Sequence, residues 1–219
     1  MKVRVKICCI ANREEARLAI SHGASAIGLV SAMPSGPGPI PEDLIREIAA
    51  TIPPGVSSFL LTSKQDAPSI IEQQRRTRVN TLQLVDTVTV ATYDELRRNL
   101  AGIALVQVIH VAGKTAIEDA RRAASHVDAI LLDSGNPSLA VKELGGTGRT
   151  HDWRISRKIR EEVEVPVFLA GGLRAENVAE AIHTVEPYAV DVCSGVRTNG
   201  RLDEGKLSRF FQSIQNIHV

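Results

Sequence analysis

Short runs of β-branched and aliphatic residues alternate with longer stretches of helical periodicity along the whole chain. The apolar runs predict eight strands, at residues 3–9, 26–32, 57–63, 81–85, 104–111, 129–134, 165–172 and 189–195. Apolar residues spaced three or four apart predict helices at residues 13–23, 41–52, 116–126, 155–163 and 175–185, with a shorter one at 94–100. Strands that alternate with helices form βαβ units, so these strands should pair in parallel.

The regular repetition of these units favours an α/β fold, a single (β/α)8 barrel domain spanning residues 1–219. An open doubly wound sheet shares the same alternation, and periodicity alone does not separate the two. No GxGxxG motif follows the first strand, which speaks against the dinucleotide site of many open sheets. The Pro/Gly-rich segment at residues 33–39 follows the second strand. We therefore predict a loop there, on the barrel face where active sites lie.

The composition indicates a protein without a strong electrostatic field. Its 26 basic and 25 acidic residues leave a formal charge of +1, which gives little attraction for nucleic acid or anionic membrane. The charged N-terminus is unlike a signal peptide, and no stretch approaches the roughly 20 apolar residues that cross a bilayer, so we expect a cytoplasmic protein. Three cysteines without CxxC spacing predict reduced thiols, and neither a disulfide framework nor a metal site.

Alternation along the first strand separates its two faces. Because residues two apart point the same way, Val5 and Ile7 should face the helices, and Lys6 and Cys8 the barrel interior, with Cys9 turned outward. A neighbouring cation such as Lys6 raises the thiolate fraction of a cysteine and makes it usable as a base or nucleophile. The alternative is that Cys8 is a small buried apolar residue, as most free cysteines are, and parity alone favours that alternative.

Two carboxylates fall on the inward face of later strands. Asp133 ends an otherwise apolar strand, and Asp191 lies between outward-facing valines. An inward, partly desolvated carboxyl group such as that of Asp133 is a candidate general acid. The alternative for Asp133 is a cap on the following segment, and for Asp191 a salt bridge to Lys6 or Arg4.

Three glycine-containing turns lie at the ends of the last three predicted strands: GGTGRT at residues 145–150, LAGGL at 169–173 and CSGV at 193–196. Glycine lets backbone N–H groups approach an anion closely, and barrels often bind phosphate through the loops after strands seven and eight. Each turn alone is weak evidence, because glycine is common in turns. Together they predict a phosphate site.

The chain resembles the phosphoribosylanthranilate isomerases of tryptophan biosynthesis in segments of fixed order: VKIC, GASAIGLV, LQL, ILLDS, GGTGRTHDW, AGGLRAENVAEAI and AVDVCSGV. The resemblance implies a (β/α)8 barrel without cofactor or metal, in which Cys8 is the general base and Asp133 the general acid. The implied reaction is an Amadori rearrangement: Asp133 protonates the ring oxygen of an aminoaldose phosphate, and Cys8 removes a proton from the adjacent carbon to give an aminoketose phosphate. The implied phosphate ligands are amides around Gly146, Gly148, Gly172 and Gly195, and the further substrate contacts are Lys6, Gln83 and Asp191.

Several positions depart from the family pattern where the anthranilate half of the substrate should bind. Cys9, Pro37, Val85 and Arg197 stand where the family has glycine, arginine, histidine and an acidic residue. A substrate carboxylate left without a partner is costly in a site that excludes solvent. In a working isomerase, Arg149, Arg197 or another cation would therefore have to replace the missing arginine.

Three functions are compatible with this pattern. The first is a working phosphoribosylanthranilate isomerase, and the second a related isomerase for a different phosphorylated sugar. The third is a non-catalytic barrel that binds a phosphorylated ligand. All three take a small phosphorylated molecule, with no nucleic acid and no membrane as partner, and all are compatible with a homodimer.

Overall fold

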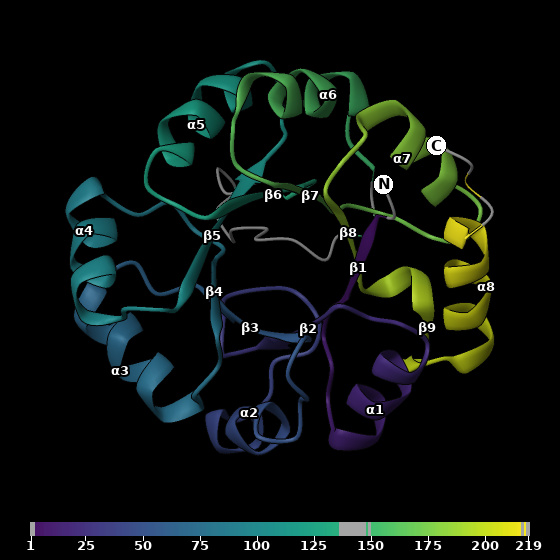
Figure 1. Ribbon diagram of the computed structural model, residues 1–219, viewed down its shortest axis with the longest axis horizontal. Coiled ribbons are helices and arrows are strands. Elements are labelled where there is room, and N and C mark those ends of the chain that lie inside the picture. The colour runs from purple at the N-terminus through teal and green to yellow at the C-terminus, as the bar shows by residue number, and fades with distance from the viewer. Residues whose placement is uncertain (1–2, 136–147, 149, 216, 218–219) are drawn as a thin grey trace.

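The computed structural model describes residues 3–135, 148, 150–215 and 217. In this part of the chain, parallel strands β1 to β8 form one closed barrel in sequence order, with the helices around its outside (Figure 1). The strands are β1 (Arg4–Ile7), β2 (Ala26–Val30), β3 (Ser57–Thr62), β4 (Thr81–Leu84), β5 (Ala104–His110), β6 (Ala129–Asp133), β7 (Val167–Leu169) and β8 (Ala189–Val192). The helices are α1 (Arg13–Ser21), α2 (Glu42–Ala49), α3 (Ala67–Thr77), α4 (Val90–Asn99), α5 (Thr115–Ala124), α6 (Trp153–Glu162), α7 (Val178–Val185) and α8 (Glu204–Gln215). The predicted (β/α)8 barrel is confirmed.

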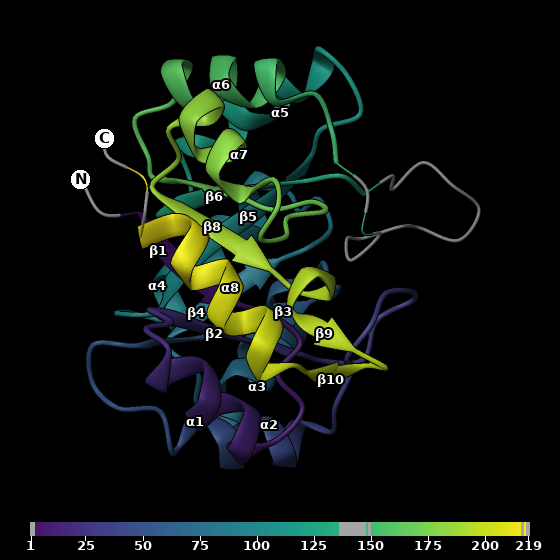
Figure 2. The same cartoon turned by 90° about the vertical axis from the view of Figure 1, so that its right-hand side faces the viewer.

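The barrel closes between its first and last strands. β1 pairs with β8 in parallel, and Lys6 lies opposite Asp191 in this register. After β8 the chain forms a 3-10 turn, η1 (Ser194–Val196), and an antiparallel hairpin of β9 (Arg197–Thr198) and β10 (Arg201–Leu202). Figure 2 shows this hairpin at the barrel end opposite the chain termini. That end carries the C-terminal ends of the parallel strands, where barrel enzymes place their active sites.

The buried apolar residues form two cores, because successive residues of a strand point to opposite sides. The larger core lies between barrel and helices and includes Val5 and Ile7 of β1. The smaller core fills the barrel interior and includes Cys8, together with Phe59 and Leu131 from β3 and β6. The predicted division of the first strand into an outer and an inner face is therefore correct as far as Cys8.

The helices differ from the sequence-based assignment in three places. The pattern assigned no helix to α3 or α8, and it began α4 at residue 94 instead of Val90. Helix α3 begins after Asp66, whose side chain caps it, and its buried face includes Gln73 and Gln74, which interrupt the apolar period. Helix α4 starts earlier because the Thr89 side chain accepts a hydrogen bond from the backbone of its first turn.

Candidate active site

A cavity opens at the C-terminal ends of the strands. Its described walls come from the ends of several strands and from the loops after β2, β7 and β8. They include six of the residues predicted to react or bind: Cys8, Gln83, Asp133, Gly148, Gly172 and Asp191. Residues far apart in the sequence thus meet around one space, as parallel strand ends in a barrel require.

Cys8 follows β1 and directs its thiol into the barrel interior. Its backbone N–H donates to the carbonyl of Val192 at 2.9 Å, which continues the pairing with β8. Gly28 on β2 leaves the room that this thiol occupies, since a Cβ there would lie 2.8 Å from Cys8 Sγ and 3.1 Å from Lys6 Nζ. The missing side chain at Gly28 therefore lets a thiol and an ammonium group share the space beside β2.

Lys6 and Asp191 form a buried ion pair below the cavity. Lys6 Nζ donates to Asp191 Oδ2 at 2.9 Å, and the side chains are 0% and 7% exposed. This contact confirms the salt bridge considered for Asp191. Burial disfavours the charge on Lys6, but the Asp191 carboxylate and the Cys8 sulfur hold its pKa above the ordinary value. Lys6 is thus a permanent cation near the Cys8 thiol.

The environment favours the thiolate form of Cys8. Its pKa is lowered, first by a hydrogen bond from the Cys9 thiol and then by the charge of Lys6, which together outweigh the effect of burial. The pKa of Cys9 is raised well above the ordinary value, first by the neighbouring thiols of Cys193 and Cys8 and then by burial. Cys8 is therefore the thiol of this group with the character of a base or nucleophile.

Asp133 ends β6 and lines the cavity with a carboxyl group that is nearly buried. The backbone N–H of Ser134 donates to Asp133 Oδ1 at 2.7 Å and fixes the side chain. Strands β7 and β8 separate β6 from β1 in the closed barrel, so Asp133 and Cys8 belong to different parts of the wall. A carboxyl group and a thiolate placed in this way can transfer protons at two atoms of one ligand.

Two buried oxygen atoms of the cavity have no hydrogen-bond partner within the described part of the chain. They are Oε1 of Gln83 and Oδ1 of Asp191, and both residues line the cavity. A buried acceptor without a donor lowers stability. Hydroxyl groups of a ligand would supply the missing donors, which suits a sugar.

The glycine turns lie partly where the phosphate prediction put them. Gly148 and Gly172 line the cavity with φ of 69° and 61°, a conformation that glycine adopts without strain. Gly195 does not line it; a Cβ there would lie 2.0 Å from the carbonyl oxygen of Leu173, so this glycine lets the loops after β7 and β8 pack together. Gly146 lies outside the described residues.

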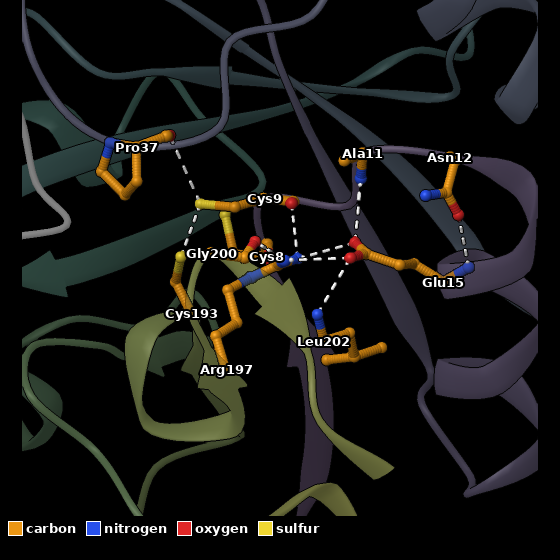
Figure 3. A network of polar contacts seen from close by, with 10 residues as sticks. All are labelled: Cys8, Cys9, Ala11, Asn12, Glu15, Pro37, Cys193, Arg197, Gly200 and Leu202. Atoms are coloured by element: carbon orange, nitrogen blue, oxygen red, sulfur yellow. Dashed lines mark hydrogen bonds and ion pairs between the residues drawn. The ribbon is translucent and has the colours of Figure 1, made fainter.

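The prediction that Cys9 turns outward is wrong. Cys9 has φ of 61°, which ends the alternation of β1, and its side chain lines the cavity. Cys9 Sγ lies 2.6 Å from Cys193 Sγ and 3.6 Å from the carbonyl oxygen of Pro37 (Figure 3). The resemblance led us to expect glycine at this position, and glycine adopts a left-handed backbone without strain. Cys193 was not singled out from the sequence, because no local pattern connects it to Cys9.

The Arg197 side chain forms hydrogen bonds to other protein groups and does not line the cavity. Its guanidinium donates to both carboxylate oxygens of Glu15, at 3.2 and 3.0 Å, and to the carbonyl groups of Cys8 and Cys9 (Figure 3). It is not among the described residues that line the cavity. Arg197 therefore ties the end of β1 to α1, and we no longer count it among the substrate contacts. Arg149, the other predicted replacement, lies outside the described residues.

Val85 follows β4 and is fully buried in the barrel interior. Its carbonyl oxygen lies 3.0 Å from Nε2 of His110, which ends the neighbouring strand β5. At the position where the resemblance led us to expect histidine, the side chain is therefore apolar, and the nearby imidazole of His110 contacts the backbone.

Among the residues that the structure describes, no three His, Cys, Asp or Glu side chains are grouped so as to hold a metal ion. None of the described helices has the length and apolar character needed to cross a membrane.

Comparison with known proteins gives one consistent result. The sequence profile described as N-(5'-phosphoribosyl)anthranilate (PRA) isomerase matches residues 5–213. The chain is 40% identical over 216 residues to N-(5'-phosphoribosyl)anthranilate isomerase 2 of Methanosarcina mazei, which covers 98% of this chain and 95% of the relative. Its fold is similar to the crystal structure of phosphoribosyl anthranilate isomerase from Thermus thermophilus, with a TM-score of 0.81, 26% identity, and coverage of 97% and 98%. It is also similar to a phosphoribosyl anthranilate isomerase solved in complex with reduced 1-(o-carboxyphenylamino)-1-deoxyribulose 5-phosphate, with a TM-score of 0.78, 28% identity, and coverage of 98% and 100%.

Proposed function

Since the chain belongs to the N-(5'-phosphoribosyl)anthranilate isomerase family, we propose that Cys8 and Asp133 perform the proton transfers of its reaction. The activity is a cofactor-independent isomerisation of an aminoaldose phosphate, phosphoribosylanthranilate, to an aminoketose phosphate. One observation supports the assignment of roles most strongly: a thiol with thiolate character and a carboxyl group face the same cavity from different strands.

The first proton transfer opens the sugar ring. Asp133, in its protonated form, gives its proton to the ring oxygen while the bond between that oxygen and C1 breaks. The nitrogen lone pair of the substrate forms the C1–N double bond of a Schiff base. Asp133 is left as a carboxylate, which the backbone N–H of Ser134 stabilises.

The second proton transfer creates the ketose. The Cys8 thiolate removes the proton on C2, and the electrons of that bond form the enolamine, which tautomerises to the ketone. The Lys6 ammonium keeps negative charge on Cys8 favourable before this step. Asp191 in turn pairs with Lys6, so that this cation is not left unpaired inside the barrel.

The remaining cavity groups hold the substrate in place. Gln83 Oε1 and Asp191 Oδ1 are acceptors that ribose hydroxyl groups would satisfy. Amides around Gly148 and Gly172 would bind the phosphate, with Gly195 keeping the two late loops together. Binding energy from the phosphate orients the sugar between acid and base.

The carboxylate of anthranilate needs a cation, and the described lining contains neither arginine nor lysine. We propose Arg149, which follows the cavity-lining Gly148 in the sequence, as its partner. Replacing Arg149 with alanine should then raise KM for phosphoribosylanthranilate by more than it lowers kcat. An unchanged KM would assign the carboxylate to another group.

We further propose that the protein acts in the cytoplasm on its small phosphorylated substrate, with no nucleic acid or membrane as partner. The near-neutral charge of +1 supports the absence of these two partners, since it gives no long-range attraction for nucleic acid or for an anionic membrane. The homodimer stays a prediction that sedimentation at several protein concentrations would test.

Turnover of phosphoribosylanthranilate by the purified, reduced protein tests the function. We expect product formation, and rescue of tryptophan growth in a strain that lacks the isomerase. Asp133→Asn and Cys8→Ser should each lower kcat by about 10²–10⁴-fold while the circular dichroism spectrum is retained. A folded protein that neither turns over this substrate nor rescues growth would refute the proposal.

A further inference from the structure

Three sulfur atoms lie side by side at the mouth of the barrel. Cys8 and Cys9 follow β1, and Cys193 follows its neighbour β8. Cys9 Sγ lies 2.6 Å from Cys193 Sγ, and the Cys8 side chain lies beside it (Figure 3). All three residues line the active-site cavity, so small molecules in that cavity can reach them.

The positions of Cys9 and Cys193 suit a covalent bond between their sulfur atoms. At 2.6 Å no other atom fits between the two sulfurs, and a disulfide bond is only about 0.6 Å shorter. Cys9 and Cys193 follow the paired strands β1 and β8, so their backbones leave neighbouring strands at the same end of the barrel. A bond between Cys8 and Cys9 is less favourable, because adjacent Cα atoms are about 3.8 Å apart, below the range that disulfides span.

We propose that Cys9 and Cys193 form a reversible disulfide that switches the active site between a reduced, active state and an oxidised, inactive state. The switch acts through Cys8 and so rests on the function proposed above. The oxidant is a low-molecular-weight disulfide or a hydroperoxide that enters the cavity. The two thiols lose two protons and two electrons and form one S–S bond, while the disulfide is reduced to two thiols or the hydroperoxide to an alcohol and water.

The consequence for catalysis follows from the position of Cys9, which adjoins Cys8 in the wall of the same cavity. In the reduced state the Cys9 thiol makes the largest contribution to the lowered pKa of Cys8. A disulfide has no S–H group, so Cys8 loses this stabilisation of its thiolate when Cys9 is oxidised. Losing one hydrogen bond to a charged group corresponds to at least about a tenfold loss of activity near neutral pH. Reduction restores the donor and the activity.

The test combines peptide mapping with turnover in glutathione redox buffers. Trypsin releases Cys8 and Cys9 together in residues 7–13, and Cys193 in residues 175–197. In the oxidised wild type we expect these two peptides to be joined by a disulfide bond. They should separate when dithiothreitol is added. The Cys8→Ser variant should form the same link, which assigns it to Cys9 and not to Cys8.

Activity provides the second measurement. The wild type should lose at least about tenfold of its turnover on oxidation and recover it with dithiothreitol. Cys193→Ser, measured relative to its own reduced activity, should lose much less. Absence of the link, a link that requires Cys8, or equal losses in Cys193→Ser and wild type would overturn the switch. If the reduced wild type has no turnover, the proposed function fails, whereas the link in Cys8→Ser still decides whether the pair forms.

Discussion

Replacing Lys6 with methionine removes the cation of a buried ion pair and leaves the Asp191 carboxylate alone. The pair is joined by a 2.9 Å contact, and its side chains are 0% and 7% exposed. Removing one partner of such a pair costs about 3–5 kcal/mol, because the other charge stays buried. This is a large part of the about 5–15 kcal/mol by which domains are stable. We therefore expect the free energy of unfolding of Lys6→Met to fall by that amount.

The double variant Lys6→Met/Asp191→Leu separates stability from catalysis. Replacing both members of a buried pair with apolar residues is often neutral, so the double variant should regain most of the stability lost by Lys6→Met. Activity should not return with it, because the variant lacks both the Lys6 cation and the Asp191 acceptor proposed for the ribose. Without the Lys6 cation the pKa of Cys8 rises, and the acidic limb of the kcat/KM profile, which reports formation of the thiolate, moves to higher pH.

Urea unfolding, monitored by circular dichroism, measures the free energy of unfolding of each variant. The dependence of kcat/KM on pH between 5 and 9 gives the position of the acidic limb. Arg13→Met is the control, since it breaks an exposed pair with Glu47 and should cost less than about 1 kcal/mol. The reasoning is refuted if the double variant is destabilised by the sum of its single variants. It is also refuted if the double variant keeps the wild-type pH profile.

Three further predictions concern groups that surround Cys8. Gly28→Ala should lower kcat on the order of 10²-fold with the fold retained, because its Cβ would lie 2.8 Å from Cys8 Sγ; unchanged kinetics would contradict this. Cys9→Gly should move the acidic limb of kcat/KM to higher pH, since the Cys9 hydrogen bond lowers the pKa of Cys8, whereas Cys9→Ser keeps a donor and should move it less. Arg197→Met should lower the free energy of unfolding by about 1–3 kcal/mol in urea, because Glu15 loses both guanidinium bonds, and an unchanged midpoint would show that the pair is dispensable.

Much of the site followed from local sequence because strand alternation is a local property. Lys6 and Cys8 face the interior as their parity requires, and Asp133 and Asp191 do the same on their own strands. The glycine turns were recognised for the same reason, since a turn needs only a few residues. The assignment of acid and base depended on the resemblance, because parity alone places a thiol and does not give it a role.

The failures concern features that depend on residues distant in sequence. The side chain of Cys9 does not follow the alternation of β1, because this residue has a positive φ. A cysteine in the sequence does not indicate a positive φ. Its contact with Cys193 spans 184 residues, and the partner of Arg197, Glu15, lies 182 residues away. Gly195 packs closely against Leu173 and does not line the cavity, and the sequence does not show this because a packing glycine and a binding glycine look alike in it. Only the closed barrel shows which loops meet.

The central claim, that Asp133 opens the ring and Cys8 removes the C2 proton, is tested most directly by a kinetic isotope effect. The measurement is kcat/KM for phosphoribosylanthranilate carrying hydrogen or deuterium at C2. In Cys8→Ser, proton removal becomes the slow step, and we predict a primary isotope effect larger than that of the wild type. In Asp133→Asn, ring opening becomes the slow step, and we predict that the effect falls towards unity. An isotope effect that grows in Asp133→Asn and disappears in Cys8→Ser would contradict the assignment of the two roles.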